Sequence, residues 1–322
     1  MTEGPRLDRS LTLHFQGDWG GANLHRVCGW LSQAMGERCG PYSRFAIWNG
    51  RGWTDAPRAV GRGQVDVALA TPAAFAAMAY TGRGPFADES YPFLRAVGSV
   101  PQNDRLVLAV GAEHGVRSFA DLRERRLPLR IATSPDDGVN FIGLAVARIL
   151  ELEGVAPATL ERWGGGFLYH EQPFPCVDAA RTGGADAVFH EAIMTPPWQA
   201  LAAEREVHFI PIDGDVLAQL ERDYGWPRGT LPAGYLRGLD APLETLDFSD
   251  FLLMVRADMP DDVAYLLAWC LGEERARLER YYRHLPPERS PVTYPLDPAK
   301  MARTPIPLHP GAERYYREYG YL

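Results

Sequence analysis

The hydrophobic pattern of residues 129–150 predicts a strand, a polar turn and then a helix. Residues 129–132 are apolar and residues 133–138 form the turn, after which apolar positions recur at helical spacing. These positions are Ile142, Ala145, Val146, Ile149 and Leu150. Such a turn is a common place to hold a small polar ligand, because free N–H groups and the positive end of the helix dipole point into it. Capping of the helix by Ser134, Asp136 or Asp137 explains the same residues, so the pattern leaves both interpretations open.

A second unit of the same kind lies near the start of the chain. Residues 11–15 predict a strand, residues 16–23 a glycine-rich turn, and residues 24–35 an amphipathic helix. The apolar face of this helix consists of Leu24, Val27, Cys28, Leu31 and Met35. About 50 residues after each unit, at residues 63–71 and 184–191, a glycine turn and an aspartate precede a short buried strand. In open parallel sheets ligands bind outside the carboxyl ends of strands, so two such halves indicate a two-lobed binding protein.

Strands and helices alternate through the rest of the chain. We expect further strands at residues 45–48, 66–70, 94–99, 106–110, 159–162, 207–212 and 248–256. We expect further helices at residues 56–61, 72–80, 116–122, 175–182, 216–224, 261–270 and 273–284. Residues 163–166, Trp-Gly-Gly-Gly, predict a flexible turn. The alternation is typical of an α/β fold with mostly parallel sheets.

The length of the chain, 322 residues, exceeds what a single core usually supports and fits two Rossmann-like lobes. We expect lobe 1 to contain residues 1–108 and 256–322, and lobe 2 to contain residues 109–255, with a ligand cleft between them. The chain would then cross between the lobes twice, within the strands near residues 106–110 and 248–255. Those two crossing strands would form the hinge.

Composition excludes several classes of function. The chain is 46% hydrophobic and 23% charged, as in ordinary globular proteins, and its net charge of −8 argues against a nucleic-acid partner. No apolar run reaches the length of a membrane span. Residues 1–10 lack the apolar segment of a secretory signal, so a native start at Met1 would indicate a cytoplasmic protein.

The four cysteines are scattered and form no Cys-x-x-Cys pair. Cys28 and Cys270 lie on apolar helix faces, where we expect them to be core residues, and Cys176 gives no further signal. Cys39 precedes a Gly-Pro turn and would reach Cys28 only if the end of the helix folds back, so a disulfide between them stays open.

The closing stretch, residues 307–320 (PLHPGAERYYREYG), resembles the end of the solute receptors of tripartite ATP-independent periplasmic (TRAP) transporters, in the TAXI subgroup. The resemblance extends through most of the chain, because further phrases follow in the order of that family. These phrases are residues 63–66, 118–122, 134–140, 184–187 and 232–235. The C-terminal motif is fairly specific, and the Gly-x-x-Asp phrases are weak singly but informative in order.

The resemblance implies a type II periplasmic-binding-protein fold, in which two α/β lobes close on a small, usually anionic, organic solute such as a carboxylate or amino acid. It also implies periplasmic residence, a TRAP permease as membrane partner and no catalysis. Two features depart from the family. The chain shows no signal peptide, and residues 49–53 (Asn-Gly-Arg-Gly-Trp) stand where the family has a Thr-Gly-Gly-Ser type of turn.

Several polar and aromatic residues lie at the predicted strand ends, each with a structural alternative. Trp19 and Trp53 lie in glycine-rich turns, where an aromatic side chain either stacks on a ligand or covers the sheet edge. Arg51 either binds a carboxylate in bidentate fashion or is simply exposed. Asn23, Thr71, Ser134 and Asn140 donate hydrogen bonds to a ligand or cap helices. The ligand-binding residues that we expect are Trp19, Gly21, Asn23, Asn49, Arg51, Trp53, Thr71, Ser134, Asp136, Asp137, Asn140, His190 and Glu191.

No motif in the sequence favours an enzyme over a receptor. His190–Glu191 follows a predicted strand, but Met194 stands where a His-Glu-x-x-His zinc motif requires histidine. No nucleophile elbow, Walker loop or dinucleotide-type glycine loop follows a strand, so we expect neither cofactor nor metal. A lyase or decarboxylase that uses Asp136, Asp137, His190 or Glu191 is the alternative, and a cytoplasmic ligand sensor is another.

The charge of the predicted cleft indicates the class of ligand. Carboxylates lie at or near the strand ends in both halves, namely Asp18, Asp55, Asp136, Asp137 and Glu191. Like charges in one crevice cost energy unless a cation or a donor is present. We therefore expect a monomeric receptor for a solute with a positive or strongly donating group, such as an amino acid or amine, whose carboxylate Arg51 holds. An ordinary organic anion is the alternative.

Overall fold

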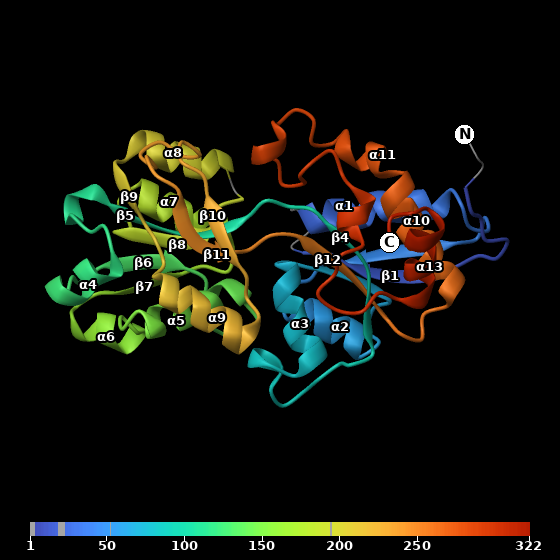
Figure 1. Cartoon of the computed structure of the whole chain (residues 1–322), viewed down its shortest axis with the longest axis horizontal. Helices are drawn as coiled ribbons and strands as arrows, with labels where there is room; N and C mark the ends of the chain where they lie inside the picture. The colour runs from blue at the N-terminus through green and yellow to red at the C-terminus, as the bar shows by residue number, and fades with distance from the viewer. Residues whose placement is uncertain (1–3, 19–22, 52, 194) are drawn as a thin grey trace. The chain divides into compact units, whose positions relative to one another are not determined.

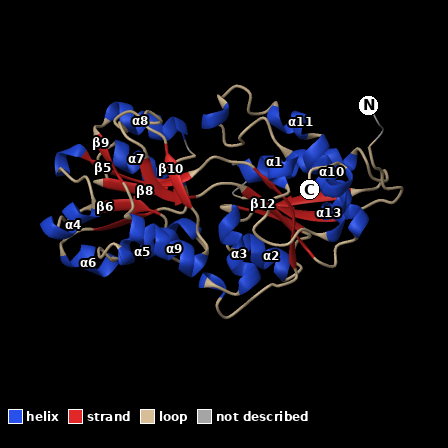
Figure 2. Cartoon of the chain, viewed as in Figure 1, coloured by secondary structure: helices blue, strands red, loops and turns tan. Residues whose placement is uncertain are grey.

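The computed structural model describes residues 4–18, 23–51, 53–193 and 195–322. These residues form two compact units, each with helices on both faces of one β-sheet (Figures 1 and 2). Unit 1 ends at Asn103 and resumes at Ser249, and unit 2 extends from Asp104 to Phe248. The prediction of two α/β lobes is confirmed.

The chain passes between the units in two short links that lie outside the strands. Strand β5 (Arg105–Gly111) belongs wholly to unit 2, and strand β12 (Phe251–Arg256) belongs wholly to unit 1. The boundaries expected at residues 108 and 255 would divide both strands. β12 stays in unit 1 because strands of that unit pair with it on both sides, and β5 is flanked by strands of unit 2 in the same way.

The sheet of unit 1 has the strand order β2–β1–β3–β12–β4. Its other strands are β1 (Thr12–Gln16), β2 (Arg44–Trp48), β3 (Val67–Ala70) and β4 (Leu94–Val100). β1 runs parallel to β2 and β3, whereas β12 is antiparallel to β3 and β4. The predicted parallel strands therefore form one side of a mixed sheet, to which the returning segment adds an antiparallel strand.

The core of unit 1 lies largely between its sheet and the helices α1 and α10. The helices are α1 (Asn23–Gly36), α2 (Asp55–Gly61), α3 (Ala73–Thr81), α10 (Asp261–Glu273), α11 (Arg275–Glu279), α12 (Pro298–Met301) and α13 (Pro310–Glu318), with 3₁₀ turns at Gly84–Phe86 and Pro287–Arg289. All five apolar positions predicted for the face of α1 are buried. Burial of each large apolar side chain contributes about 1.5–3 kcal/mol, which explains why this face fixes the helix on the sheet.

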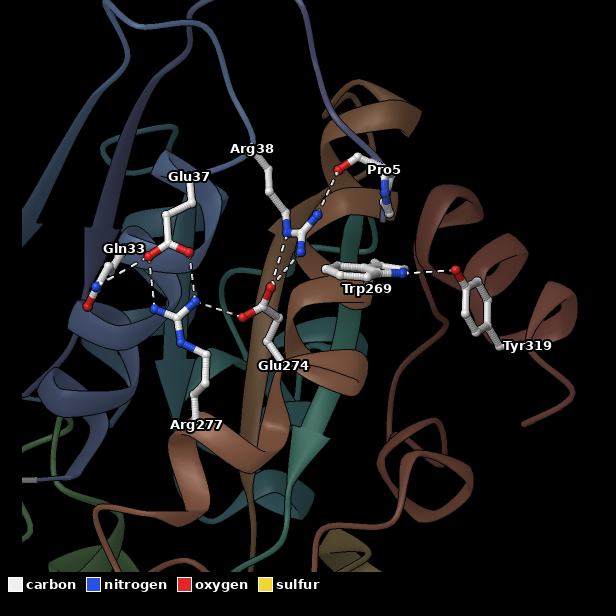
Figure 3. Close-up of polar contacts among 8 residues, drawn as sticks. All are labelled: Pro5, Gln33, Glu37, Arg38, Trp269, Glu274, Arg277 and Tyr319. Carbon is white, nitrogen blue, oxygen red and sulfur yellow. Dashed lines mark hydrogen bonds and ion pairs between the residues drawn. The ribbon is translucent and has the colours of Figure 1, made fainter. Parts of the chain in front are cut away.

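A network of charged side chains ties the end of α1 to the end of α10 (Figure 3). The Arg38 guanidinium donates to the Glu274 carboxylate at 2.6 Å and covers the Trp269 ring at 3.9 Å from its centroid. Arg277 bridges Glu274 at 2.8 Å and Glu37 at 2.7 Å. Both side chains of the Arg38–Glu274 pair are largely buried, so removal of one partner would leave the other charge buried and unpaired.

The sheet of unit 2 has the strand order β10–β11–β5–β8–β6–β7, with β9 also paired to β5. Its other strands are β6 (Arg130–Thr133), β7 (Gly166–Tyr169), β8 (Ala187–Glu191), β9 (Val207–Ile210), β10 (Arg228–Leu231) and β11 (Leu243–Asp247). β6 is parallel to β7 and β8, and the remaining pairs are antiparallel. The second unit thus repeats a three-stranded parallel group, here β7–β6–β8, inside a mixed sheet.

The helices of unit 2 correct one part of the sequence interpretation. They are α4 (Phe119–Arg125), α5 (Phe141–Leu152), α6 (Pro157–Arg162), α7 (Pro173–Arg181), α8 (Thr195–Glu204) and α9 (Gly214–Tyr224), with a 3₁₀ turn at Ala112–His114. The strand predicted at residues 159–162 is wrong, because Pro157 begins helix α6 there. The strand follows instead at β7, immediately after Gly164 at φ +89° and Gly165, whose added Cβ would lie 2.5 Å from the Leu129 carbonyl oxygen.

An aspartate at the same place in each unit explains the repeated glycine–aspartate phrase. In unit 1 the Asp66 carboxylate accepts from the His14 N–H of β1 at 2.7 Å. In unit 2 the Asp186 carboxylate accepts from the Arg130 N–H of β6 at 2.8 Å. Each aspartate also donates its own backbone N–H to the carbonyl of the same strand residue. The phrase therefore fixes the third parallel strand against the first.

All four cysteines are free, so the open question of a disulfide between Cys28 and Cys39 is answered against one. Cys28, Cys176 and Cys270 are buried, and burial raises the pKa of each thiol. The prediction that Cys28 and Cys270 are core residues is confirmed.

Candidate functional site

The carboxyl edge of unit 2, where β6, β7 and β8 end, gathers the polar residues of the second half of the chain. Thr133 pairs with Tyr169 at the ends of β6 and β7, and the His170 N–H continues this pairing by donating to the Thr133 carbonyl at 3.1 Å. The Ser134 Oγ lies 3.1 Å from the His190 Nε2 at the end of β8. Parallel strands therefore bring these residues together, as the pattern predicts.

The turn between β6 and α5 is held by its own side chains. The Asp137 carboxylate accepts from the N–H groups of Val139 and Asn140 at 3.0 and 2.9 Å. The Asn140 Oδ1 caps α5 by accepting from Ile142 at 2.9 Å and from Gly143 at 3.4 Å. Because side chains of the turn occupy these N–H groups, the capping interpretation holds for Asp137 and Asn140. The hypothesis that free backbone N–H groups of this helix receive a ligand loses its main support.

Two buried polar atoms beside this turn have no hydrogen-bond partner in the part of the chain that the structure describes. They are the Thr133 Oγ1 and the Asn140 Nδ2, and both residues are 1% exposed. Ser134, also 1% exposed, lies between them in the sequence and contacts His190. Leaving such groups unpaired costs free energy, so native structures usually supply them with a partner. The Thr133 Oγ1, the Ser134 hydroxyl and the Asn140 Nδ2 are therefore the candidate donors at this edge.

His190 is neutral, and each of its ring nitrogens lies within hydrogen-bond distance of a neighbouring group. Its ring is fully buried, and burial lowers its pKa to about 3. The Glu191 backbone N–H donates to the His190 Nδ1 at 2.9 Å, and Ser134 lies at Nε2. A neutral, buried imidazole is a poor general base for the enzyme alternative, because it takes up a proton only in strong acid.

Two buried carboxylates lie next to one another at the end of β8. Glu191 is 6% exposed and Asp104 is 1% exposed. The Asp104 Oδ1 accepts from the backbone N–H groups of Arg105, Ala192 and Ile193 at 2.7 to 3.0 Å. Burial and the charge of Glu191 raise the pKa of Asp104 well above its usual value. No motif marks Asp104, which directly precedes strand β5.

Three of the carboxylates predicted for the cleft, Asp55, Asp136 and Asp137, lie in or next to turns of the two units. Asp136 and Asp137 are exposed, and Asp137 is used by backbone N–H groups. In unit 1 the Asp55 carboxylate accepts from the Gln16 amide at 3.1 Å and from the Arg51 backbone N–H at 2.6 Å. Burial raises the pKa of Asp55, the backbone donors partly offset that effect, and the residue holds the turn after β2 in place.

The carboxyl edge of unit 1 contains the remaining predicted residues. Asn49 is exposed and Arg51 is half-buried. Trp53 is 2% exposed, so its indole is more suited to covering the sheet edge than to stacking on a ligand. The Thr71 Oγ1 at the end of β3 is buried and has no partner among the described residues. The Asn23 Oδ1 accepts from the Tyr282 hydroxyl at 3.3 Å. Trp19 and Gly21 lie outside the described residues.

Within the described ranges, no group of three or more His, Cys, Asp or Glu side chains is arranged to hold a metal ion. The helices of these ranges include none that is long and apolar enough to span a membrane.

A protein-family model matches residues 49–320, which is most of the chain, and its description is the NMT1-like family. The chain belongs to the NMT1-like family. The match includes the turn after β2, the whole of unit 2 and the C-terminal motif. It does not identify the TAXI subgroup.

Solved structures share the fold across nearly the whole chain. XAC2383 from Xanthomonas citri bound to ATP has 15% identity and a TM-score of 0.53, covering 96% of this chain and 99% of that one. PhnD1 from Prochlorococcus marinus in complex with methylphosphonate has 10% identity and a TM-score of 0.53, with coverage of 97% and 99%. A structure described as a periplasmic transporter has 13% identity and a TM-score of 0.51, with coverage of 97% and 95%.

The similarity to these structures supports the two-lobed α/β fold that the resemblance implies. At these identities the structural similarity establishes the fold and not the ligand.

Proposed function

We propose that this protein captures a small organic solute by holding its oxyanion group at the carboxyl edge of unit 2. The observation that carries the proposal is the pair of buried atoms without partners, the Thr133 Oγ1 and the Asn140 Nδ2, on either side of Ser134. A carboxylate or phosphonate offers several lone pairs and no competing donor, so it would satisfy all three side chains at once. The methylphosphonate bound to PhnD1 is one such solute.

We further propose that the solute is an amino acid or a related carboxylate that carries a donating group. Glu191 supports this class, because its carboxylate lies beside the buried Asp104 at the same edge. A protonated amine next to this pair would offset the repulsion between like charges. Arg51, with Trp19, Asn23, Asn49 and Thr71, remains the proposed contribution of unit 1. That both edges enclose one solute stays a prediction.

The resemblance to TAXI receptors supports delivery of the solute to a TRAP permease, and with it an extracytoplasmic location. A ligand sensor would use the same site without a permease. Solute uptake by membrane vesicles that contain a TRAP permease, with and without this protein, separates the two roles. Uptake that depends on the protein supports transport, whereas binding without any effect on uptake supports the sensor.

A calorimetric screen tests the ligand class directly. We expect glutamate and other amino acids to bind more tightly than simple amines, and succinate and methylphosphonate to identify any general preference for oxyanions. Arg51→Ala and Glu191→Gln should weaken amino-acid binding, because each removes a charge complementary to the zwitterion. Tight binding of succinate that Glu191→Gln improves would support the simple organic anion instead. Absence of binding for the whole panel would contradict the proposal.

A further inference from the structure

We infer that His190 is a positioning residue that fixes the direction of the Ser134 hydroxyl, so that this hydroxyl donates its proton to the solute. The inference rests on the proposed function, since it names what makes the site select hydrogen-bond acceptors. Both nitrogens of the buried His190 ring lie within hydrogen-bond distance of a neighbour, Glu191 at one and Ser134 at the other.

The first step is the tautomer of His190. The Glu191 backbone N–H is 2.9 Å from the His190 Nδ1, and a backbone amide is always a donor. The Nδ1 must therefore accept, which excludes a proton there. The ring is fully buried and neutral, as its lowered pKa requires, so its single proton is on Nε2.

The second step is the direction of the next hydrogen bond. The Nε2 lies 3.1 Å from the Ser134 Oγ, and a protonated Nε2 donates to that oxygen. A serine hydroxyl has one proton, and this proton cannot point back at a nitrogen that is itself donating. In the described part of the chain the Ser134 hydroxyl makes no other hydrogen bond, although the residue is 1% exposed.

The third step is the consequence for the solute. With its lone pair engaged by His190, Ser134 presents its O–H as a donor, as the Asn140 Nδ2 does. A hydrogen-bond acceptor of the solute can therefore bind the Ser134 O–H, whereas an N–H group of the solute at the same place would face another donor. The chain of hydrogen bonds runs from a β8 backbone amide through the imidazole to the hydroxyl, so the fold of unit 2 sets the polarity of the site.

The polarity predicts a difference between an acid and its amide. We expect the wild-type protein to prefer succinate over succinamide. In His190→Gln the side-chain amide either donates or accepts, so Ser134 is released to either role. The ratio of the two affinities should then fall about tenfold, the usual effect of one hydrogen bond to a charged group. His190→Phe is the second variant, and it should lower the ratio similarly.

Two measurements distinguish this inference from failure of the proposed function. Nitrogen chemical shifts of the free wild-type protein should show a protonated Nε2 and an unprotonated Nδ1 for His190 between pH 5 and 8. The affinity for succinate should also not strengthen as the pH falls through 6.5, where a charged histidine would attract the anion. A proton on Nδ1, tighter binding at low pH, or an unchanged ratio in folded His190→Gln overturns the inference. Absence of binding for succinate, succinamide, glutamate and the rest of the panel, with the tautomer as stated, overturns the proposed function.

Discussion

At the scale of single residues, the structure uses carboxylates mainly to hold the backbone in place. Asp66 and Asp186 secure the first strand of each parallel group, and Asp137 secures the turn before α5. Asp55 does the same after β2. Asp55 and Asp137 were expected among the carboxylates of a ligand cleft, but backbone N–H groups in turns also need acceptors, and these two residues supply them.

Removing one of these acceptors should weaken the fold. We predict that Asp66→Ala lowers the free energy of unfolding by about 1–2 kcal/mol, because the His14 N–H loses its partner. Asp66→Asn keeps an acceptor oxygen and should cost clearly less. Urea unfolding of the three proteins checks this. Equal stability of Asp66→Ala and wild type would show that the bond contributes nothing.

A buried carboxyl outside the candidate site should make stability depend on pH. Glu153, at the end of α5, accepts from the Asp213 N–H at 2.8 Å and lies 3.3 Å from Arg123. Burial, together with the neighbouring Asp213, raises its pKa to about 7, and Arg123 offsets only part of this.

The folded-state pKa of Glu153 lies above its unfolded-state pKa. At pH values between these two pKa values, the folded state therefore binds more protons than the unfolded state. Its contribution to stability is therefore lost as the pH rises from about 4.5 to about 7. We predict that the free energy of unfolding of Glu153→Gln rises relative to that of wild type by about 1–3 kcal/mol between pH 5 and pH 8, as measured by denaturant unfolding. Parallel stability curves for the two proteins would contradict the raised pKa.

The sequence located part of the candidate site at this scale. Ser134 and His190 were expected at neighbouring strand ends, and their side chains lie 3.1 Å apart. Thr133 was taken for a turn residue and Asp104 was missed, because the burial of both and the missing partner of the Thr133 Oγ1 are properties of the packed unit that no local pattern shows. Whether these residues bind a solute remains a prediction.

At the scale of elements, the C-terminal motif is explained by the docking of α13. The His309 Nδ1 accepts from the Gly311 N–H at 3.1 Å and caps the helix. A Cβ on Gly311 would lie 2.0 Å from the Asp261 carbonyl oxygen, so only glycine allows this approach to α10. Tyr315 and Tyr316 are fully buried, and the motif that carries the family resemblance is therefore structural.

The contact between α10 and α13 depends on Gly272. A Cβ there would lie 1.9 Å from the Tyr315 hydroxyl oxygen, and the Tyr315 side chain is fully buried. We predict that Gly272→Ala destabilises unit 1 by about 1–3 kcal/mol, measured by denaturant unfolding. Gly214→Ala is the control, because nothing lies within 4 Å of its added Cβ and alanine favours the helix α9. A loss of stability no larger than that of the control would contradict the close packing.

Elements were predictable where the apolar pattern was long and regular. The helices α1 and α5 match the expected ranges to within about two residues. The region of α6 and β7 was misread, because the run at residues 159–162 is too short for its period to separate helix from strand. The β10–β11 hairpin was missed for the same reason, since its strands are short and their pairing depends on the rest of the sheet.

At the scale of the whole molecule, the repeat of one topology in two units was predictable and the division of the chain was less so. Strand–turn–helix units with similar phrases indicated two lobes, and both units have the three-stranded parallel group. The exact links depend on which sheet captures β5 and β12, and this is decided by long-range pairing.

The resemblance to binding proteins predicts a motion of the whole chain. We expect a saturating solute to close the units about the links at residues 103–104 and 248–249, as a hinge. Small-angle scattering should then show a smaller radius of gyration with solute than without it. An unchanged radius at saturation would contradict hinge closure on binding.

The central claim, that side-chain donors around residues 133–140 hold the oxyanion of a solute, is tested most directly by Asn140→Asp. Aspartate keeps the acceptor that caps α5 and replaces the buried Nδ2 donor with a negative oxygen. Calorimetry with glutamate, succinate and methylphosphonate, alongside Ser134→Ala, should show affinity lowered at least about tenfold in both variants while the fold is retained. Undiminished affinity in a folded Asn140→Asp protein would contradict the account.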